Sequence, residues 1–151
     1  MKIAFDLDDT LVPTTTEFSV GANPISFPFN LIFKERLRSG SIELMKRLSK
    51  HHDVWVYTTS CRPSWYVYAW FRLCGIKLGG IVNAPAHLAA VQGTIFQNLS
   101  KAPRLFDIDI IVDDSAGVAT ECKKQNVRCI HIKPNQCDWV STVIHSVLKA
   151  H

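Results

Sequence analysis

Short apolar segments of strand character alternate along this chain with longer segments of helical period. Strands of a parallel sheet are buried on both faces and appear as short apolar runs, whereas surface helices repeat apolar residues every three or four positions. The alternation predicts an α/β fold, a mostly parallel sheet covered by helices on both faces. Strands are expected at residues 2–7, 54–57, 78–82, 108–112 and 129–132, and helices at 42–50, 64–74, 85–99, 116–126 and from Asp138 onward.

The composition fits one folded domain. The chain has 151 residues, and domains commonly run to about 100–200 residues. Apolar residues make up 47% and charged residues 20%, which is enough to bury a hydrophobic core and excludes a disordered chain. The chain has no internal repeat, low-complexity tract or linker rich in Pro, Gly or Ser, so we expect a single domain over residues 1–151.

The sequence predicts neither a membrane-spanning helix nor a signal for export. The longest hydrophobic run, Trp65–Phe71, has seven residues, far below the roughly 20 that cross a bilayer. Aspartates near the N-terminus interrupt any cleavable apolar segment. Five cysteines, an odd number without CxxC spacing, favour thiols in a reducing compartment such as the cytoplasm. His51 and His52 lack further ligands at zinc-site spacing, so no structural zinc is expected.

Three of the expected strands run into carboxylates and hydroxyls, at residues 6–10, 58–60 and 113–115. In open parallel sheets, ligands bind beyond the carboxyl ends of the strands, near the point where the strand order reverses. These residues are therefore expected at one rim. Helix capping would account for Ser115 and Thr59. Four or five converging carboxylates, however, would repel one another unless a cation or a function held them there.

The aspartates of the first strand end are spaced for shared chemistry. Asp6 and Asp8 are two apart on an extended segment, so their side chains face the same way. With Asp113 they offer the hard oxygen ligands that Mg²⁺ prefers. Beside such an ion, one carboxylate can attack phosphorus to form an aspartyl-phosphate, while a second carboxylic acid protonates the departing alcohol and later activates water. The charge on the phosphoryl group also requires donors and a cation, which Thr58 and Lys101 could supply.

The segment Ile3–Val12, with the sequence IAFDLDDTLV, resembles the first motif, DxDx[TV]L, of the haloacid dehalogenase-like (HAD) hydrolases, most of which are phosphatases. Three further motifs follow in the family's order: Thr58 at the end of the second strand, Lys101 as the lysine, and residues 111–114 as the acidic motif. The resemblance extends from residue 2 to about residue 132. It implies a Rossmann-like three-layer α/β/α sandwich whose five strands lie in the order 5-4-1-2-3.

The resemblance also implies roles for these residues. Asp6 would be the nucleophile and a Mg²⁺ ligand, and Asp8 would be the general acid/base that also ligates the metal through its carbonyl. Thr58 and Lys101 would hold the phosphoryl group, although Lys77 is another lysine in the chain. Further candidates are Asp113 and Asp114 as metal ligands, either of which could be the main one, and Thr59 and Arg62 as phosphate contacts; Arg62 could equally pair with a nearby acidic side chain.

The spacing between the motifs leaves no room for a folded cap. The segment at about residues 12–40 is long enough for a flap over the site but not for a folded cap. Residues 61–100 are accounted for by two expected helices and a strand. The resemblance is therefore to a capless, C0-type member with an open site. Dehalogenases of the family lack an acid/base carboxylate at the position of Asp8, so a phosphatase is favoured over an enzyme that cleaves carbon–halogen bonds.

The sequence predicts a Mg²⁺-dependent phosphatase that hydrolyses a phosphomonoester of unknown identity. Three alternatives stay open: a polynucleotide or nucleotide end phosphatase, a phosphotransferase, and a non-catalytic binding module. The net charge is +4, and outside the two acidic clusters Lys and Arg outnumber Asp and Glu about two to one. This excess suits an anionic ligand, but a solvated surface explains it more simply, so a nucleic-acid partner is not favoured.

The helix expected at residues 64–74 is unusually aromatic. Helical spacing places Val67, Trp70, Phe71 and Cys74 on the core face. Trp65 and the nearby Tyr68 fall on another face, where partial burial under a loop, a homodimer contact and base stacking are alternatives.

Overall fold

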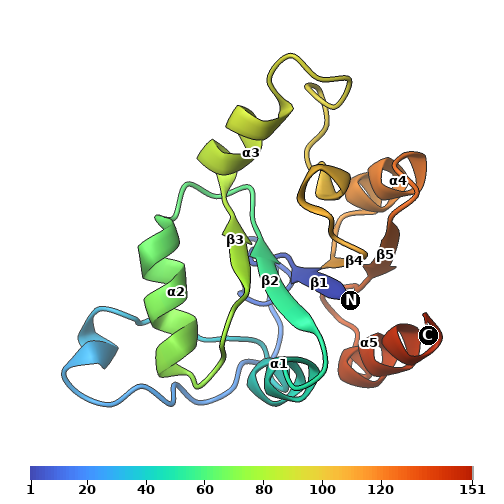
Figure 1. The fold of residues 1–151 in the computed structure, drawn as a ribbon. Helices are drawn as coiled ribbons and strands as arrows, with labels where there is room; N and C mark the ends of the chain where they lie inside the picture. The colour runs from blue at the N-terminus through green and yellow to red at the C-terminus, as the bar shows by residue number, and fades with distance from the viewer. Residues whose placement is uncertain (151) are drawn as a thin grey trace.

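The computed structural model describes residues 1–150 and has the predicted architecture (Figure 1). Within this range five parallel strands form one sheet in the order β3-β2-β1-β4-β5, as expected. The first strand lies at the centre because β2 and β4 pair with its two edges. The strands are β1 (Lys2–Phe5), β2 (Asp53–Tyr57), β3 (Gly80–Val82), β4 (Ile110–Asp113) and β5 (Arg128–His131).

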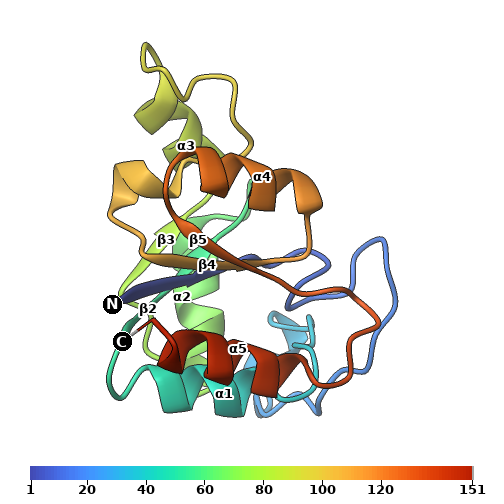
Figure 2. The same cartoon turned by 90° about the vertical axis from the view of Figure 1, so that its right-hand side faces the viewer.

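Helices cover both faces of the sheet, as Figure 2 shows. Successive strand residues point to opposite faces, so Ile3 and Phe5 of β1 belong to one hydrophobic cluster and Ala4 to another. The larger cluster lies under α1 (Ser41–Leu48), α2 (Ser64–Leu73) and α5 (Trp139–Leu148), and the smaller lies under α3 (Ala84–Val91) and α4 (Ala116–Lys124).

One predicted helix is too long. The segment 85–99 is helical only as far as Val91, and Gln92 leaves the helical conformation. Gly93 then adopts a positive φ of 72°, a left-handed conformation that glycine reaches without steric penalty. The remaining residues form turns that lead to a short 3₁₀ helix, η2 (Pro103–Phe106). The apolar residues of this stretch mimic a helical pattern that the glycine ends.

The segment between β1 and α1 has little regular structure. It contains a short 3₁₀ helix, η1 (Phe29–Leu31), and an isolated antiparallel bridge between Val20 and Arg38. Buried Arg38 donates through Nη2 to three carbonyl oxygens of residues 133–136, at 2.9–3.1 Å. These bonds tie the segment to the loop before α5. That residues 12–40 act as a flap, and that the chain is a single domain, stay predictions.

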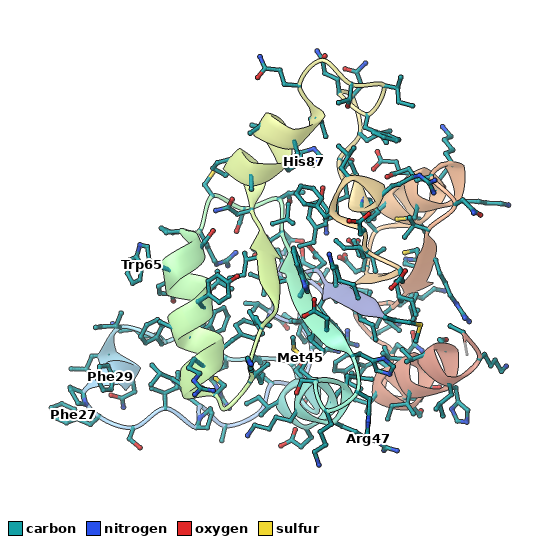
Figure 3. The ribbon with its side chains drawn as sticks, viewed as in Figure 1. Phe27, Phe29, Met45, Arg47, Trp65 and His87 are labelled. Carbon is teal, nitrogen blue, oxygen red and sulfur yellow. The ribbon has the colours of Figure 1, made fainter. Side chains whose placement is uncertain are left out.

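The aromatic helix α2 divides its residues between core and solvent. Val67, Trp70 and Phe71 are buried, as expected from their spacing. The exposed fractions of Trp65 and Tyr68 are 66% and 42%, and Figure 3 shows Trp65 pointing away from the sheet. A homodimer contact at this face stays a prediction. All five cysteines are free thiols, and within residues 1–150 no helix is both long and apolar enough to span a membrane.

Candidate active site

The carboxyl ends of the three central strands meet at one rim, and the polar residues predicted there lie together. Asp6 follows β1, and its backbone N–H donates to the carbonyl of Val112 in β4 at 2.9 Å. Thr58 follows β2, and Asp113 ends β4. The strand register places Asp6 level with Asp113 and one residue short of Thr58, so the three positions lie at the same edge of the sheet. The rim therefore follows from the strand order.

Lys101 lies at the centre of this rim. Its Nζ is 2.5 Å from Asp6 Oδ1 and 2.5 Å from Asp113 Oδ2, and its side chain is 2% exposed. Burial lowers the pKa of Lys101, but the two carboxylates outweigh this and raise the pKa above its ordinary value. Burial raises the pKa of the Asp6 carboxyl to about 7, against the opposing effect of Lys101. Lys101 is thus a buried ammonium shared by two buried carboxyl groups.

The loop that carries Lys101 is held by side chains of α4 and its C-terminal end. The carboxylate of Glu121 accepts hydrogen bonds from the backbone N–H groups of Ser100 and Lys101, at 3.1–3.2 Å. Gln125 Nε2 donates to the carbonyl of Lys101 at 3.0 Å. These contacts fix the backbone on both sides of Lys101, so its long side chain reaches the rim from a defined point.

Asp6, Asp113 and Asp114 form an acidic cluster with one carboxylate oxygen of each within 4.8 Å of the others. Asp113 is also held by the backbone N–H of Ser115, which donates to its Oδ1 at 2.8 Å. Thr10 Oγ1 donates to Asp114 at 3.1 Å, and burial raises the pKa of Asp114. Among residues 1–150, these three hard oxygen donors share one ammonium, that of Lys101, and such a set fits a small divalent cation such as Mg²⁺.

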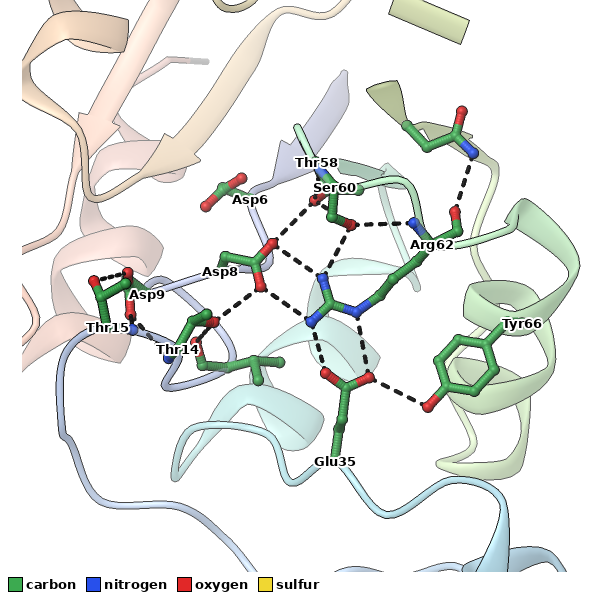
Figure 4. A network of polar contacts seen from close by, with 12 residues as sticks. Asp6, Asp8, Asp9, Thr14, Thr15, Glu35, Thr58, Ser60, Arg62 and Tyr66 are labelled. Carbon is green, nitrogen blue, oxygen red and sulfur yellow. Dashed lines mark hydrogen bonds and ion pairs between the residues drawn. The ribbon is translucent and has the colours of Figure 1, made fainter. Parts of the chain in front are cut away.

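The Asp8 carboxylate turns away from this cluster, toward the loop after β2 (Figure 4). Arg62 donates to both of its oxygens at 3.0 Å, and Thr14 Oγ1 donates at 2.9 Å. Burial raises the pKa of Asp8, but the hydrogen bonds from Arg62 and Thr14 outweigh it and lower the pKa below its ordinary value. A metal contact of Asp8 through its backbone carbonyl stays a prediction.

Arg62 pairs with two acidic side chains, the alternative that the sequence left open. Its guanidinium binds Asp8 on one edge and Glu35 on the other, and Nη1 also donates to Ser60 Oγ. Since every N–H of the guanidinium has a protein acceptor, a phosphate contact would require one of these bonds to exchange. Phosphate binding by Arg62 stays a prediction.

The two predicted threonines differ in exposure. Thr58 is fully buried, and its Oγ1 lies 3.4 Å from Asp8 Oδ2 while accepting a hydrogen bond from the backbone N–H of Ser60 at 3.0 Å. Thr59 is exposed. A phosphate role for either threonine stays a prediction.

Several residues that support the site carried no sequence signal. Tyr57 accepts a hydrogen bond from the backbone N–H of Ala102 at 2.9 Å, and its hydroxyl lies 2.6 Å from His87 Nδ1. Burial raises the pKa of Tyr57 to about 12. Because the carbonyl of Leu99 can only accept, His87 Nε2 donates to it at 3.0 Å, which leaves Nδ1 to accept from the Tyr57 hydroxyl. This chain of bonds links β2 and α3 to the loop of Lys101.

Replacing Tyr57 with Phe should lower the free energy of unfolding by about 1–3 kcal/mol, the range for a buried polar group left without its partner. The variant strands the N–H of Ala102 and Nδ1 of His87. Urea unfolding of the variant measures the loss. Tyr68, which is 42% exposed, provides the matched control, since Tyr68→Phe should leave stability within a few tenths of a kcal/mol. Equal stability of the two variants would contradict the assigned network.

Asp9 organises the chain immediately after the first motif. It has a positive φ of 62°, a conformation that Asp and Asn tolerate better than most residues. Its carboxylate accepts from the backbone N–H groups of Thr14, Thr15 and Thr16 at 2.7–3.0 Å. Burial opposes ionisation, but these bonds and those from the hydroxyls of Thr15 and Thr16 hold the pKa of Asp9 far below 3.8.

Asp9→Asn should therefore lower stability near neutral pH by about 1 kcal/mol, as expected for weakened charge-assisted hydrogen bonds. Because the folded-state pKa lies below the ordinary value of 3.8, the contribution of the carboxylate is complete above that value and is lost as the pH falls through the folded-state pKa. Unfolding of both proteins at neutral and acidic pH should show the difference shrinking on acidification. A difference that is constant with pH would show that the charge of Asp9 contributes nothing.

Known proteins that resemble this chain agree with the family that its motifs indicate. A family model of NLI interacting factor-like phosphatases matches residues 1–142. The chain belongs to this family. It is therefore a hydrolase of the HAD-like superfamily, and the resemblance seen in its motifs is confirmed. None of the curated proteins matches the chain.

Two solved structures show the fold of this NLI interacting factor-like phosphatase in other proteins. A predicted HAD-like family hydrolase from Porphyromonas gingivalis has a TM-score of 0.55 at 7% identity, with 97% of each chain covered. A chain of the Pnkp1/Rnl/Hen1 complex has a TM-score of 0.52 at 11% identity, over 87% of this chain. The chain spans 46% of the length of that second protein. At these identities the likeness concerns the fold alone.

Proposed function

We propose that this phosphatase hydrolyses a phosphomonoester in the presence of Mg²⁺, through an aspartyl-phosphate on Asp6. The observation that supports this most directly is the position of Asp6: its buried carboxylate lies at the carboxyl end of the central strand, 2.5 Å from the ammonium of Lys101 and within the acidic cluster. A nucleophilic carboxylate needs such a neighbouring cation to approach a charged phosphoryl group.

The reaction would proceed in two steps. In the first, an oxygen of Asp6 forms a bond to phosphorus while the bond from phosphorus to the alcohol oxygen breaks, and Asp8 donates a proton to the departing alcohol. In the second, Asp8 takes a proton from water as the water oxygen attacks phosphorus, which releases inorganic phosphate and restores the Asp6 carboxylate. The hydrogen bonds that lower the pKa of Asp8 keep it in the ionised form from which the second step starts. In the first step, the proton on Asp8 would replace one of its two hydrogen bonds from Arg62, and the other bond would still orient the group.

The remaining residues would bind and orient the phosphoryl group. We assign its contacts to Thr58 and Lys101, with Thr59 and Arg62 as further candidates on the adjoining loop. Mg²⁺ would be held by the carboxylates of Asp6, Asp113 and Asp114 and by the carbonyl of Asp8, and when bound it would neutralise charge on the phosphoryl oxygens.

A screen of the purified chain against a panel of phosphate esters tests the proposal. The panel should include small esters, a phosphopeptide and an oligonucleotide with a terminal phosphate, each assayed with Mg²⁺ and with a chelator. We expect phosphate release that requires Mg²⁺. Asp6→Asn should abolish release from every ester of the panel, and Asp8→Asn should abolish release from an alkyl ester. Release that persists in both variants would refute the roles given to the two aspartates.

A further inference from the structure

The guanidinium of Arg62 is held on both edges by carboxylates (Figure 4). Asp8 accepts from Nη1 and Nη2 at 3.0 Å each, and Glu35 accepts from Nη2 at 2.6 Å and from Nε at 3.3 Å. Ser60 Oγ accepts the remaining bond from Nη1 at 3.0 Å. Because the guanidinium is planar and its donors form a fixed fork, bonds on two edges fix both its position and its rotation.

Glu35 is itself anchored. Tyr66 of α2 donates its hydroxyl to Glu35 Oε2 at 3.2 Å, and the ring of Tyr66 packs on Phe33 with centroids 5.1 Å apart. Glu35 thus extends from the long segment between β1 and α1 across to α2, and reaches Arg62 from the side opposite Asp8. Loss of Glu35 would leave the N–H of Nε and one N–H of Nη2 without their acceptor. The guanidinium would then be restrained by its bonds to Asp8 and Ser60.

The exposure of these groups argues for a role beyond stability. The side chains of Asp8, Arg62 and Glu35 are 27%, 21% and 30% exposed, and ion pairs in contact with solvent contribute little to the free energy of folding. Two carboxylates on one guanidinium also repel each other. The arrangement can contribute more by orienting Asp8 than by stabilising the fold, since a misplacement of about 1 Å in a reacting group can lower a rate about 10²-fold.

We propose that Glu35 is a positioning residue of the active site: it fixes the guanidinium of Arg62, and through it the direction in which Asp8 presents its carboxyl group to the leaving alcohol. The inference rests on the proposed function, in which Asp8 is the general acid and base. Glu35 touches neither substrate nor reacting atoms. It acts through Arg62, which within residues 1–150 is the side chain that donates to both oxygens of Asp8.

Two esters that differ only in their alcohol test the assignment. The anion of nitrophenol leaves readily without a proton, whereas an alkyl alcohol depends on the proton from a correctly placed acid. Because Asp8 also activates water in the second step, which both esters share, the quantity to compare is kcat/KM, which reports only the steps up to departure of the alcohol. Glu35→Gln should lower kcat/KM for an alkyl phosphate by about tenfold or more. It should change kcat/KM for nitrophenyl phosphate by less than about threefold. Glu17→Gln, the same change at an exposed position of the same segment, should leave both values as in the wild type.

The outcomes separate this inference from the proposed function. An equal loss of kcat/KM for the two esters, a loss for the alkyl ester that lies wholly in KM, or a Glu35→Gln variant that behaves as Glu17→Gln would overturn the positioning role. Asp6→Asn, assayed in parallel, must abolish turnover of both esters. If it does not, the proposed function fails and this inference fails with it; if it does, the comparison of Glu35→Gln with Glu17→Gln decides the inference alone.

A second measurement covers a Glu35→Gln variant that fails to fold. In the wild-type chain, the Nε–H proton of Arg62 should exchange with water more slowly in NMR spectra than that of exposed Arg47, because Glu35 holds it. Slower exchange at Arg62 supports the proposal that Glu35 fixes its guanidinium. Equal exchange at the two arginines overturns it, whatever the kinetics show.

Discussion

Replacing Asp6 with Asn should lower kcat for phosphate ester hydrolysis by at least about 10³-fold, since removal of a nucleophile typically costs this much or more. The amide keeps the size of the carboxyl group but cannot form the acyl-phosphate bond. Steady-state phosphate release with Mg²⁺ measures the effect. Trapping of labelled phosphate on the wild-type chain, and not on the variant, provides a second readout.

Asp107→Asn is the matched control for this substitution. Asp107 is exposed in the loop that precedes β4, at the end of that strand opposite the site, and its φ of 53° is one that Asn also adopts. The control should retain wild-type kcat and stability. An Asp6→Asn variant that is folded and as active as Asp107→Asn would remove Asp6 from the chemistry.

Replacing Lys101 with Met should lower the free energy of unfolding by about 3–5 kcal/mol when no divalent cation is present, as measured for buried ion pairs that lose one partner. The substitution leaves the carboxylates of Asp6 and Asp113 buried without their shared ammonium. Mg²⁺ should restore part of this loss, because a cation bound only by the folded state stabilises it, by about 2.7 kcal/mol at a concentration of 100 Kd. Thermal unfolding with a chelator and over a Mg²⁺ titration measures both effects.

Lys77→Met is the control for this experiment, and it also tests the other lysine that the sequence offered. Lys77 is exposed after α2 and should contribute little to stability or activity. We expect Mg²⁺ to raise the unfolding temperature of Lys101→Met by more than that of Lys77→Met. The same rise in both proteins would show that the cation binds away from Lys101.

The rim of the site was predictable because its signals are local. Each central strand is a short apolar run, and the polar residues that follow it are adjacent in sequence, so the parallel order alone brings Asp6, Thr58 and Asp113 together. The resemblance to HAD-like motifs pointed to Lys101 as the motif lysine. Structure then shows that its side chain reaches both aspartates.

The supports of the site were not predictable by the same means. Glu35 lies 27 residues before Arg62, in a segment without hydrophobic periodicity, and only the folded chain brings the two together. Tyr57 looks like any aromatic residue of a buried strand until its hydroxyl is seen between Ala102 and His87. The helix predicted at residues 85–99 is an error of the opposite kind. There the local apolar pattern indicates a helix, but the chain leaves the helix after Val91 and Gly93 takes a positive φ.

The single ammonium among the clustered aspartates has an electrostatic consequence for how many cations the rim can take. When all three carboxylates are ionised, as a bound cation would favour, they and Lys101 together carry two negative charges. One divalent cation cancels them, so a phosphate dianion would meet an electroneutral surface rather than a repulsive one. A second divalent cation would lack a matching pair of anions, and the stoichiometry expected of this rim is therefore one.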